Sequence, residues 1–107
     1  MKRGDLYRVR RPTGDPKRSR VFVVVGRQAV IDSRLATVVC APVLSQRGGL
    51  STEVDVGPAE GLKHDSSVHC DLLMSVPKTA LTDFVGSLAP ASVARLDAAL
   101  RIALALE

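Results

Sequence analysis

The sequence predicts one small domain that is mainly β and has a single long helix at its carboxyl end. Short apolar segments rich in β-branched residues recur along the chain between charged or turn-forming residues, and such segments are typical of strands. Only residues 90–104 space their apolar side chains as an amphipathic helix does. Because 107 residues suffice for one modest core, we expect residues 1–107 to fold together as a small twisted β-barrel.

Two apolar runs, 20–25 and 37–43, form the predicted centre of the sheet. Each run is short and continuous, which is typical of a strand that is buried on both faces. The first run begins at Arg20, and the second leads into Leu44 and Ser45. If the two strands pair antiparallel, these polar ends lie at the same edge of the sheet.

The other elements follow from local patterns. Residues 6–10 alternate apolar and basic side chains, which predicts a half-exposed strand with Tyr7 and Val9 on one face. Residues 11–19 contain two prolines and a glycine, so we expect a basic loop there. The remaining predicted elements are a short helical turn within 26–34, strands at 50–56, 66–76 and 84–88, a turn at 57–61, and a one-turn helix at 78–81.

The final helix is predicted to begin at Pro90, because proline suits the first helical position, where its missing N–H would have no partner. The preceding Ala89 is a poor N-cap and costs about 1 kcal/mol relative to serine. The predicted buried face comprises Val93, Leu96, Leu100, Ala103 and Leu104. Aromatic content is 3%, so the core must consist mainly of Val, Leu, Ala and Ile, with Phe22 and Phe84 also expected inside.

Charge is unevenly distributed along the chain. Residues 1–28 carry nine basic and two acidic side chains, a net charge of +7, whereas the other residues carry six basic and nine acidic side chains, a net charge of −3. This asymmetry is typical of an electropositive face that meets a polyanion. A well-solvated charged surface is the alternative interpretation.

Several classes of protein are not favoured by the sequence. No apolar run is long enough to span a bilayer, and the charged amino terminus does not look like a signal segment. Cys40 and Cys70 lie in apolar segments, which favours buried free thiols over a disulfide and fits a reducing cytoplasm. The His, Cys and Asp residues within 64–71 match no familiar zinc spacing, so we expect neither a metal nor another cofactor.

A series of short motifs then becomes informative through its order and spacing. The motifs are RGDLY at 3–7, PTG at 12–14, Arg20 before the Val-rich run, APVLS at 41–45, EV at 53–54, GLKHDS at 61–66, VPK at 76–78 with Leu81, and GSL at 86–88 before the helix that includes AAL at 98–100. Together they resemble the MazF/PemK toxins of bacterial type II toxin–antitoxin systems, over residues 3 to about 106.

The resemblance implies an SH3-like (PemK/CcdB-type) small β-barrel that forms a homodimer. It implies a cytoplasmic, metal-independent endoribonuclease that cuts single-stranded mRNA at short sequences and so inhibits translation and growth. The 2′-hydroxyl of the substrate would attack the phosphodiester and leave a 2′,3′-cyclic phosphate. A cognate antitoxin would inhibit the enzyme by laying an extended segment over the active site.

The resemblance also assigns site residues. Arg20 matches the family arginine, and a guanidinium suits a phosphate because it is always charged and grips two oxygens. Either Leu44 or Ser45 matches the family threonine, and of the two only Ser45 has a hydroxyl, so Arg20 and Ser45 are the predicted catalytic residues. A solvated strand-end arginine and an ordinary turn serine are the structural alternatives. The predicted RNA-binding residues are Arg10, Arg11, Lys17, Arg18, Gln46, Arg47 and His64.

The chain departs from the family pattern at two further places. Val21 stands where relatives often have proline after the arginine, and no cation lies near Leu73 and Met74, where some relatives carry an arginine. If that arginine is an acid in relatives, Lys17, Arg18 or His64 would have to replace it here. Two rival functions therefore stay open: a gyrase poison like CcdB, and a nucleic-acid-binding regulator without catalytic activity.

Overall fold

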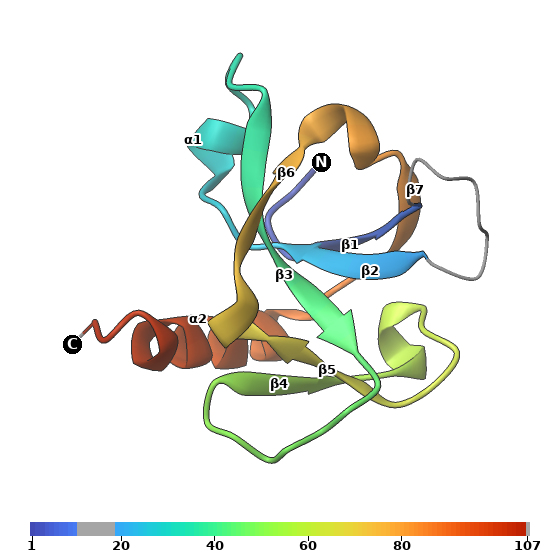
Figure 1. The fold of residues 1–107 in the computed structure, drawn as a ribbon, viewed down its shortest axis with the longest axis vertical. Coiled ribbons are helices and arrows are strands. Elements are labelled where there is room, and N and C mark those ends of the chain that lie inside the picture. The colour runs from blue at the N-terminus through green and yellow to red at the C-terminus, as the bar shows by residue number, and fades with distance from the viewer. Residues whose placement is uncertain (11–18, 107) are drawn as a thin grey trace.

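The fold comes from a computed structural model, which describes residues 1–10 and 19–106 (Figure 1). Within these residues, seven strands form one sheet. The elements in chain order are β1 (Asp5–Val9), β2 (Arg20–Val24), α1 (Gln28–Ile31), β3 (Thr37–Leu44), β4 (Glu53–Val56), η2 (Pro58–Glu60), β5 (Ser66–His69), η3 (Cys70–Leu72), β6 (Met74–Pro77), η4 (Lys78–Ala80), β7 (Asp83–Ser87) and α2 (Pro90–Ala103), where η marks a short 3-10 helix. The basic loop expected at 11–19 lies outside the described residues except for Ser19, and so do Arg11, Lys17 and Arg18.

The strands are arranged around β3, which pairs with three neighbours. The order is β4-β5-β3-β2-β1-β7, and β6 also pairs with β3. Every pairing is antiparallel, with β6 on the first half of β3 and β5 on its last residues. The sheet therefore curls into a partial barrel, as Figure 1 shows, and α2 lies against one of its faces. The predicted fold class is confirmed.

The first core lies between the sheet and α2. Leu6, Val23 and Val68 point toward the helix, where Leu96 and Ala99 are buried against them. Val93, Leu100 and Ala103 of the predicted helix face are partly buried there. Leu104 was wrongly placed on this face: it is 53% exposed, because α2 ends at Ala103 and the chain turns away. The helix begins at Pro90 after an Ala89 cap without a side-chain hydrogen bond, as predicted.

The second core lies on the opposite face of the same strands. Along β2, Val21 and Val23 enter the first core, whereas Phe22 and Val24 enter the second, with Val38 and Val76. Because β2 is buried on both faces, its sequence does not alternate apolar and polar residues, and the prediction for β2 is confirmed. The same prediction for β3 is wrong in its first half, where Thr37 and Val39 are exposed. Phe84 was wrongly expected in the core. It lies on β7, at the edge of the sheet, and is 57% exposed.

The strand predicted at 66–76 is interrupted. An uninterrupted strand that pairs Val68 with Val43 would place Asp71 opposite Cys40, but the residue found there is Met74, three positions later. The three residues of η3, Cys70–Leu72, take up this shift. The chain can thus follow both halves of β3 as the sheet bends.

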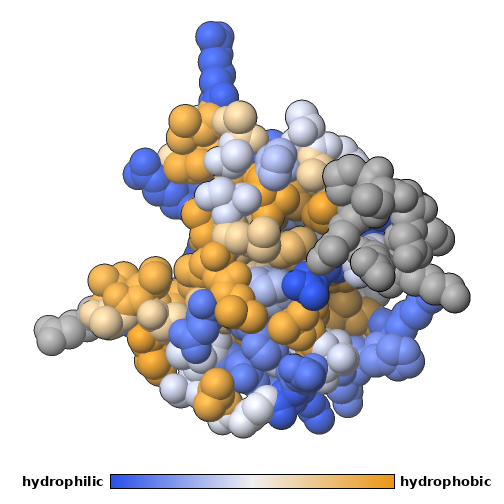
Figure 2. Space-filling model, viewed as in Figure 1, coloured by the Kyte–Doolittle hydropathy of each residue, from blue (hydrophilic) through white to orange (hydrophobic). Residues whose placement is uncertain are grey.

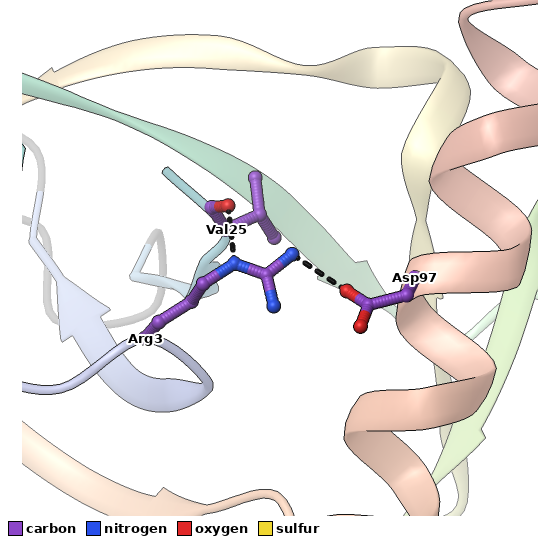
Figure 3. A network of polar contacts seen from close by, with 3 residues as sticks. All are labelled: Arg3, Val25 and Asp97. Carbon is purple, nitrogen blue, oxygen red and sulfur yellow. Dashed lines mark hydrogen bonds and ion pairs between the residues drawn. The ribbon is translucent and has the colours of Figure 1, made fainter. Parts of the chain in front are cut away.

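An ion pair ties the amino-terminal segment to the helix (Figure 3). The Arg3 guanidinium donates from Nη2 to Asp97 Oδ1 at 2.8 Å and from Nε to the Val25 carbonyl at 2.9 Å. Asp5 is buried and accepts from the Lys2 amide at 2.8 Å and the Ser87 hydroxyl at 2.7 Å. Asp5 therefore fixes the first turn, and Arg3 is occupied by a structural contact.

Cys40 and Cys70 are buried free thiols, as predicted. Burial raises the pKa of Cys40 to about 12, and burial with the nearby charge of Asp71 raises the pKa of Cys70 to about 11. Both thiols therefore stay protonated at neutral pH, which makes them weak nucleophiles. In the described part of the chain, no helix has the length and apolar character needed to cross a membrane.

The packing of η2 against the edge strand β7 can be tested at Gly86. A Cβ added at Gly86 would collide with the carbonyl oxygen of Glu60. We therefore expect Gly86→Ala to lower the free energy of unfolding by about 3 kcal/mol, as overpacked sites do. Gly49→Ala is the control, because Gly49 has a φ of +70° but no atom within 4 Å of an added Cβ. It should cost about 1 kcal/mol from backbone strain alone. Urea unfolding measures both values, and equal losses would contradict the assigned contact.

Candidate functional site

Several strand ends gather at one edge of the sheet, which we call the mouth. The mouth comprises the end of β1 with Arg10, the start of β2 with Arg20, the end of β3 with residues 44–47, and the residues before β5, His64 and Asp65. Antiparallel pairing brings these ends together, because Val9 lies opposite Arg20, Val21 opposite Val43, and Leu44 opposite Ser67. The two central strands therefore present their polar ends side by side.

The register of β2 and β3 decides which residue faces the arginine. Val21 pairs with Val43, so one step further along the same register places Arg20 opposite Leu44. Ser45 follows in a bend directly after β3, and its side chain is exposed. Arg20 is also exposed and belongs to neither of the two ion pairs found among the described residues. The backbone of Arg20 thus lies across from that of Leu44, and Ser45 follows one residue further along the chain.

The loop that carries Ser45 is held to the outer face of β4 and β5. The Ser67 hydroxyl donates to the Gln46 carbonyl at 2.9 Å, and His69 Nε2 lies 3.0 Å from both that carbonyl and Ser67 Oγ. The Gly48 amide donates to Glu53 Oε1 at 2.8 Å. Ser67 is fully buried, so its hydrogen bond is shielded from water. We call Ser67, His69 and Glu53 the loop anchor, because they fix residues 46–48 beside the mouth.

The sequence analysis missed the loop anchor. Ser67 and His69 alternate with the buried Val68, so the pattern of β5 placed them together on one face. That they meet the Gln46 carbonyl depends on the pairing of β5 with β3, which no local pattern shows. Cys70 points instead into the first core. In residues 1–10 and 19–106, no group of three or more His, Cys, Asp or Glu side chains is placed to hold a metal ion.

The predicted RNA-binding residues that the structure describes all lie near the mouth. Gln46, Arg47 and His64 are exposed. Arg10 is 69% exposed and forms a loose ion pair with Asp83 at 3.7 Å, and such exposed pairs contribute little and separate easily. The charge around the mouth is mixed, however. Arg47 lines a shallow hollow of about 280 Å³ together with Asp55, Glu60 and Asp65.

The position near Leu73 and Met74 lies away from the mouth. Met74 pairs with Cys40, four residues before Leu44 on β3, a separation of about 13 Å along a strand. If an arginine at that position serves as the acid in relatives, it has no counterpart there in this chain. Of the three replacements considered from the sequence, His64 is the one within the described residues, and it lies at the start of β5.

The fold and the mouth define a small curled-sheet protein with an exposed arginine where its two central strands end. The family model of PemK-like, MazF-like toxins of type II toxin–antitoxin systems matches residues 2–104. The chain belongs to this family, as the resemblance indicated.

Three solved structures are similar to this chain. A mycobacterial endoribonuclease in complex with its cognate antitoxin is 27% identical, with a TM-score of 0.84 over 100% of this chain and 97% of that one. The Mycobacterium tuberculosis toxin MazF-mt6 is 26% identical, with a TM-score of 0.83 over 96% of this chain and 98% of that one. An Mtb toxin is 31% identical, with a TM-score of 0.72 over 78% of this chain and 91% of that one.

The loop anchor can be tested by removing its buried hydroxyl. Ser67→Ala deletes the hydrogen bond to the Gln46 carbonyl, so we expect a loss of about 1 kcal/mol in the free energy of unfolding. The amides of residues 46–49 should exchange with solvent faster, whereas those of β2 should not change. Ser66→Ala is the control, because the Ser66 hydroxyl donates to the His64 carbonyl instead. Hydrogen exchange followed by NMR measures the effect, and unchanged protection in Ser67→Ala would refute the anchor.

Proposed function

We propose that this chain is the endoribonuclease toxin of a type II toxin–antitoxin system and cleaves single-stranded mRNA without a metal ion. The observation that supports this most is the exposed Arg20 at the start of β2, beside the end of β3. Structural relatives that cover nearly the whole chain include a mycobacterial endoribonuclease. A cytoplasmic location, where mRNA and ribosomes are present, follows from this function.

The proposed reaction uses the 2′-hydroxyl of the RNA as nucleophile. Its oxygen attacks the adjacent phosphorus, the bond from phosphorus to the 5′-oxygen breaks, and the products end in a 2′,3′-cyclic phosphate and a 5′-hydroxyl. The nucleophile loses a proton and the leaving oxygen gains one. Negative charge builds on the phosphate oxygens in the transition state, so the most useful protein group is a fixed cation that touches them.

Arg20 supplies this cation. Its guanidinium can donate two parallel hydrogen bonds to two phosphate oxygens. Ser45 adds a neutral hydroxyl donor from the bend after β3. His64, whose imidazole can both accept and donate a proton through its two ring nitrogens, is the proposed proton carrier within the described residues.

The rest of the RNA is proposed to follow the mouth. Arg10 and Arg47 contact phosphates, and Gln46 contacts a base or a sugar. Arg11, Lys17 and Arg18 are further RNA-binding candidates from the sequence. Binding through phosphates releases counterions, so affinity should fall steeply with salt. The acidic groups beside Arg47, which include Asp65 of the mouth, would repel a phosphate chain that extends past Arg47 into the hollow.

An apolar surface supports the proposed homodimer. Leu72, Met74, Ile102, Leu104 and Leu106 are each between 48% and 60% exposed and form what we call the apolar face. Figure 2 shows hydrophobic surface over β6 and the carboxyl end of α2, and η3 packs on α2. Clusters of this kind mark protein–protein contacts more often than isolated exposed leucines do.

The proposed antitoxin is a separate protein that covers the mouth. One structural relative is an endoribonuclease in complex with its cognate antitoxin. An extended antitoxin segment with carboxylates could occupy the same cations as RNA, so toxin activity would return when the antitoxin is lost.

Cleavage can be tested with purified, antitoxin-free protein and a mixed-sequence RNA in EDTA. We expect discrete fragments that end in 2′,3′-cyclic phosphates. Arg20→Ala should lower kcat/KM at least 100-fold, because it removes charge stabilisation worth about 3 kcal/mol. Arg20→Lys should recover part of the activity, since it keeps the charge but not the paired donors. All three proteins should melt at nearly the same temperature, because Arg20 is exposed.

Other results would favour the rival functions. Intact RNA with the unmodified protein would exclude the proposed nuclease. RNA retarded on a gel without cleavage would indicate a binding regulator. Toxicity that survives Arg20→Ala but is lost after changes at the carboxyl end of α2 would indicate a gyrase poison like CcdB.

The dimer can be tested at the apolar face. Ile102→Lys would bury an unpaired charge in the proposed dimer interface, which is unfavourable in free energy. Twofold symmetry would repeat this unfavourable burial on both chains. We expect the variant to sediment as a monomer at concentrations where the unmodified protein is a dimer. Leu50→Lys, at a position 59% exposed in the loop before β4, is the matched control and should leave the dimer intact. A dimeric Ile102→Lys protein would contradict the assigned interface.

A further inference from the structure

Phe84 is the exposed member of a small aromatic set. The chain has one tyrosine, two phenylalanines and no tryptophan. Tyr7 and Phe22 are buried in the second core, whereas Phe84 is 57% exposed. An edge strand does not need an aromatic side chain at an exposed position, and a charged or polar residue there would protect the edge better. Phe84 is therefore the aromatic side chain that a ligand at the surface could contact.

Phe84 lies on the same face of the sheet as Arg20. Tyr7 pairs with Phe84 on one side and with Phe22 on the other. Two residues further along β1, Val9 pairs with Arg20. Residues two apart on a strand share a face, so Phe84, Tyr7, Val9 and Arg20 all point to one side. Two strand spacings and two residues along a strand separate Phe84 from Arg20 by about 12 Å, a distance that a neighbouring nucleotide can span.

The ring of Phe84 packs against the ring of Tyr7 on the neighbouring strand. Its centroid lies 5.6 Å from that of Tyr7, and the two rings meet edge to face at 73°. Such a pair is a favourable aromatic geometry, and Tyr7 is itself 9% exposed and therefore fixed by the core. The Phe84 ring is thus ordered before any ligand binds, so ligand binding does not have to restrict its rotation.

The surrounding charge favours a nucleic acid over an apolar partner. Arg10, directly after β1, and Arg20, at the start of β2, lie on the two strands next in order to β7, and both are exposed. The acidic neighbour Asp83 lies within 3.7 Å of Arg10, which offsets its charge. An aromatic surface beside cations that hold the backbone is the common way in which proteins bind single-stranded RNA, because every base has a face that can stack.

We propose that Phe84 is the stacking surface for an unpaired RNA base next to the cleaved phosphodiester. This inference depends on the proposed cleavage at Arg20, which sets where the phosphate lies. Stacking tolerates any base, so Phe84 would add affinity and fix the direction of the strand across the mouth. The choice of cleavage sequence would come from other groups, such as those of the loop after β3.

The test uses three substitutions of Phe84 in the full chain. Phe84→Tyr keeps the aromatic face, whereas Phe84→Leu keeps apolar bulk without it. We expect Phe84→Leu and Phe84→Ala to raise KM or lower kcat/KM by about tenfold, as the loss of one stacked base does, and Phe84→Tyr to match the unmodified protein. Because more than half of the side chain is exposed, melting temperatures should change little.

A spectroscopic readout reports the stacking directly. Phe84→Trp introduces the sole tryptophan of the chain, and a base that stacks on the indole should quench its fluorescence. The titrant is a short RNA with a 2′-deoxy nucleotide at the cleavage site, which binds but cannot be cut. Quenching should be lost when the nucleotide beside that site is replaced by an abasic one, and retained when the abasic nucleotide lies far from it.

The outcomes separate this inference from the proposed function. Normal cleavage by Phe84→Leu together with no quenching in Phe84→Trp would overturn the stacking role and leave the nuclease assignment intact. Quenching of Phe84→Trp by RNA, together with no cleavage by the unmodified protein, would overturn the nuclease assignment instead. Normal cleavage by Phe84→Leu with weakened antitoxin binding would show that the surface accepts a peptide side chain, and this too would overturn the inference.

Discussion

The antiparallel pairing of β2 with β3 is the constraint on which the rest of the structure depends. Residues 21–24 are buried on both faces of the sheet, with alternate side chains in separate cores. A slip of one residue in this pairing would exchange the two sets of side chains and disrupt both cores. The packing therefore fixes the register, and the register places Arg20 beside the end of β3. The cation that we propose to be catalytic is thus held in position by the division of the apolar side chains of β2 between the two cores.

The mouth combines this fixed cation with more adjustable parts. Ser45 belongs to a loop, but Ser67 and His69 contact the carbonyl of the following residue, Gln46, and so limit the movement of the loop. Acidic and basic side chains are mixed near Arg47, so the mainly basic part of the mouth is limited to Arg20 and the end of β1. Catalytic groups on loops that a rigid scaffold positions are common in enzymes. Here the scaffold is the curled sheet, and the loop anchor extends it by a few residues.

The sequence was sufficient for features that depend on local pattern. It predicted the two central strands, the final helix and the family, because apolar periodicity and motif order carry these directly. It could not predict which of Leu44 and Ser45 faces Arg20, since this depends on the register between strands. Phe84 was wrongly assigned to the core for a similar reason: its segment is apolar, and only the strand order shows that it lies at an edge. The roles of Arg20 and Ser45 remain predictions.

The central claim is that the Arg20 guanidinium binds the phosphate of the phosphodiester that is cleaved. The most direct measurement is a crystal structure of the protein bound to an RNA that carries a 2′-deoxy nucleotide at the mapped cleavage site, which prevents the reaction. We predict that the phosphate following this nucleotide lies within hydrogen-bonding distance of the guanidinium and next to residues 44–45. RNA bound across another surface, with Arg20 in solvent, would contradict the account.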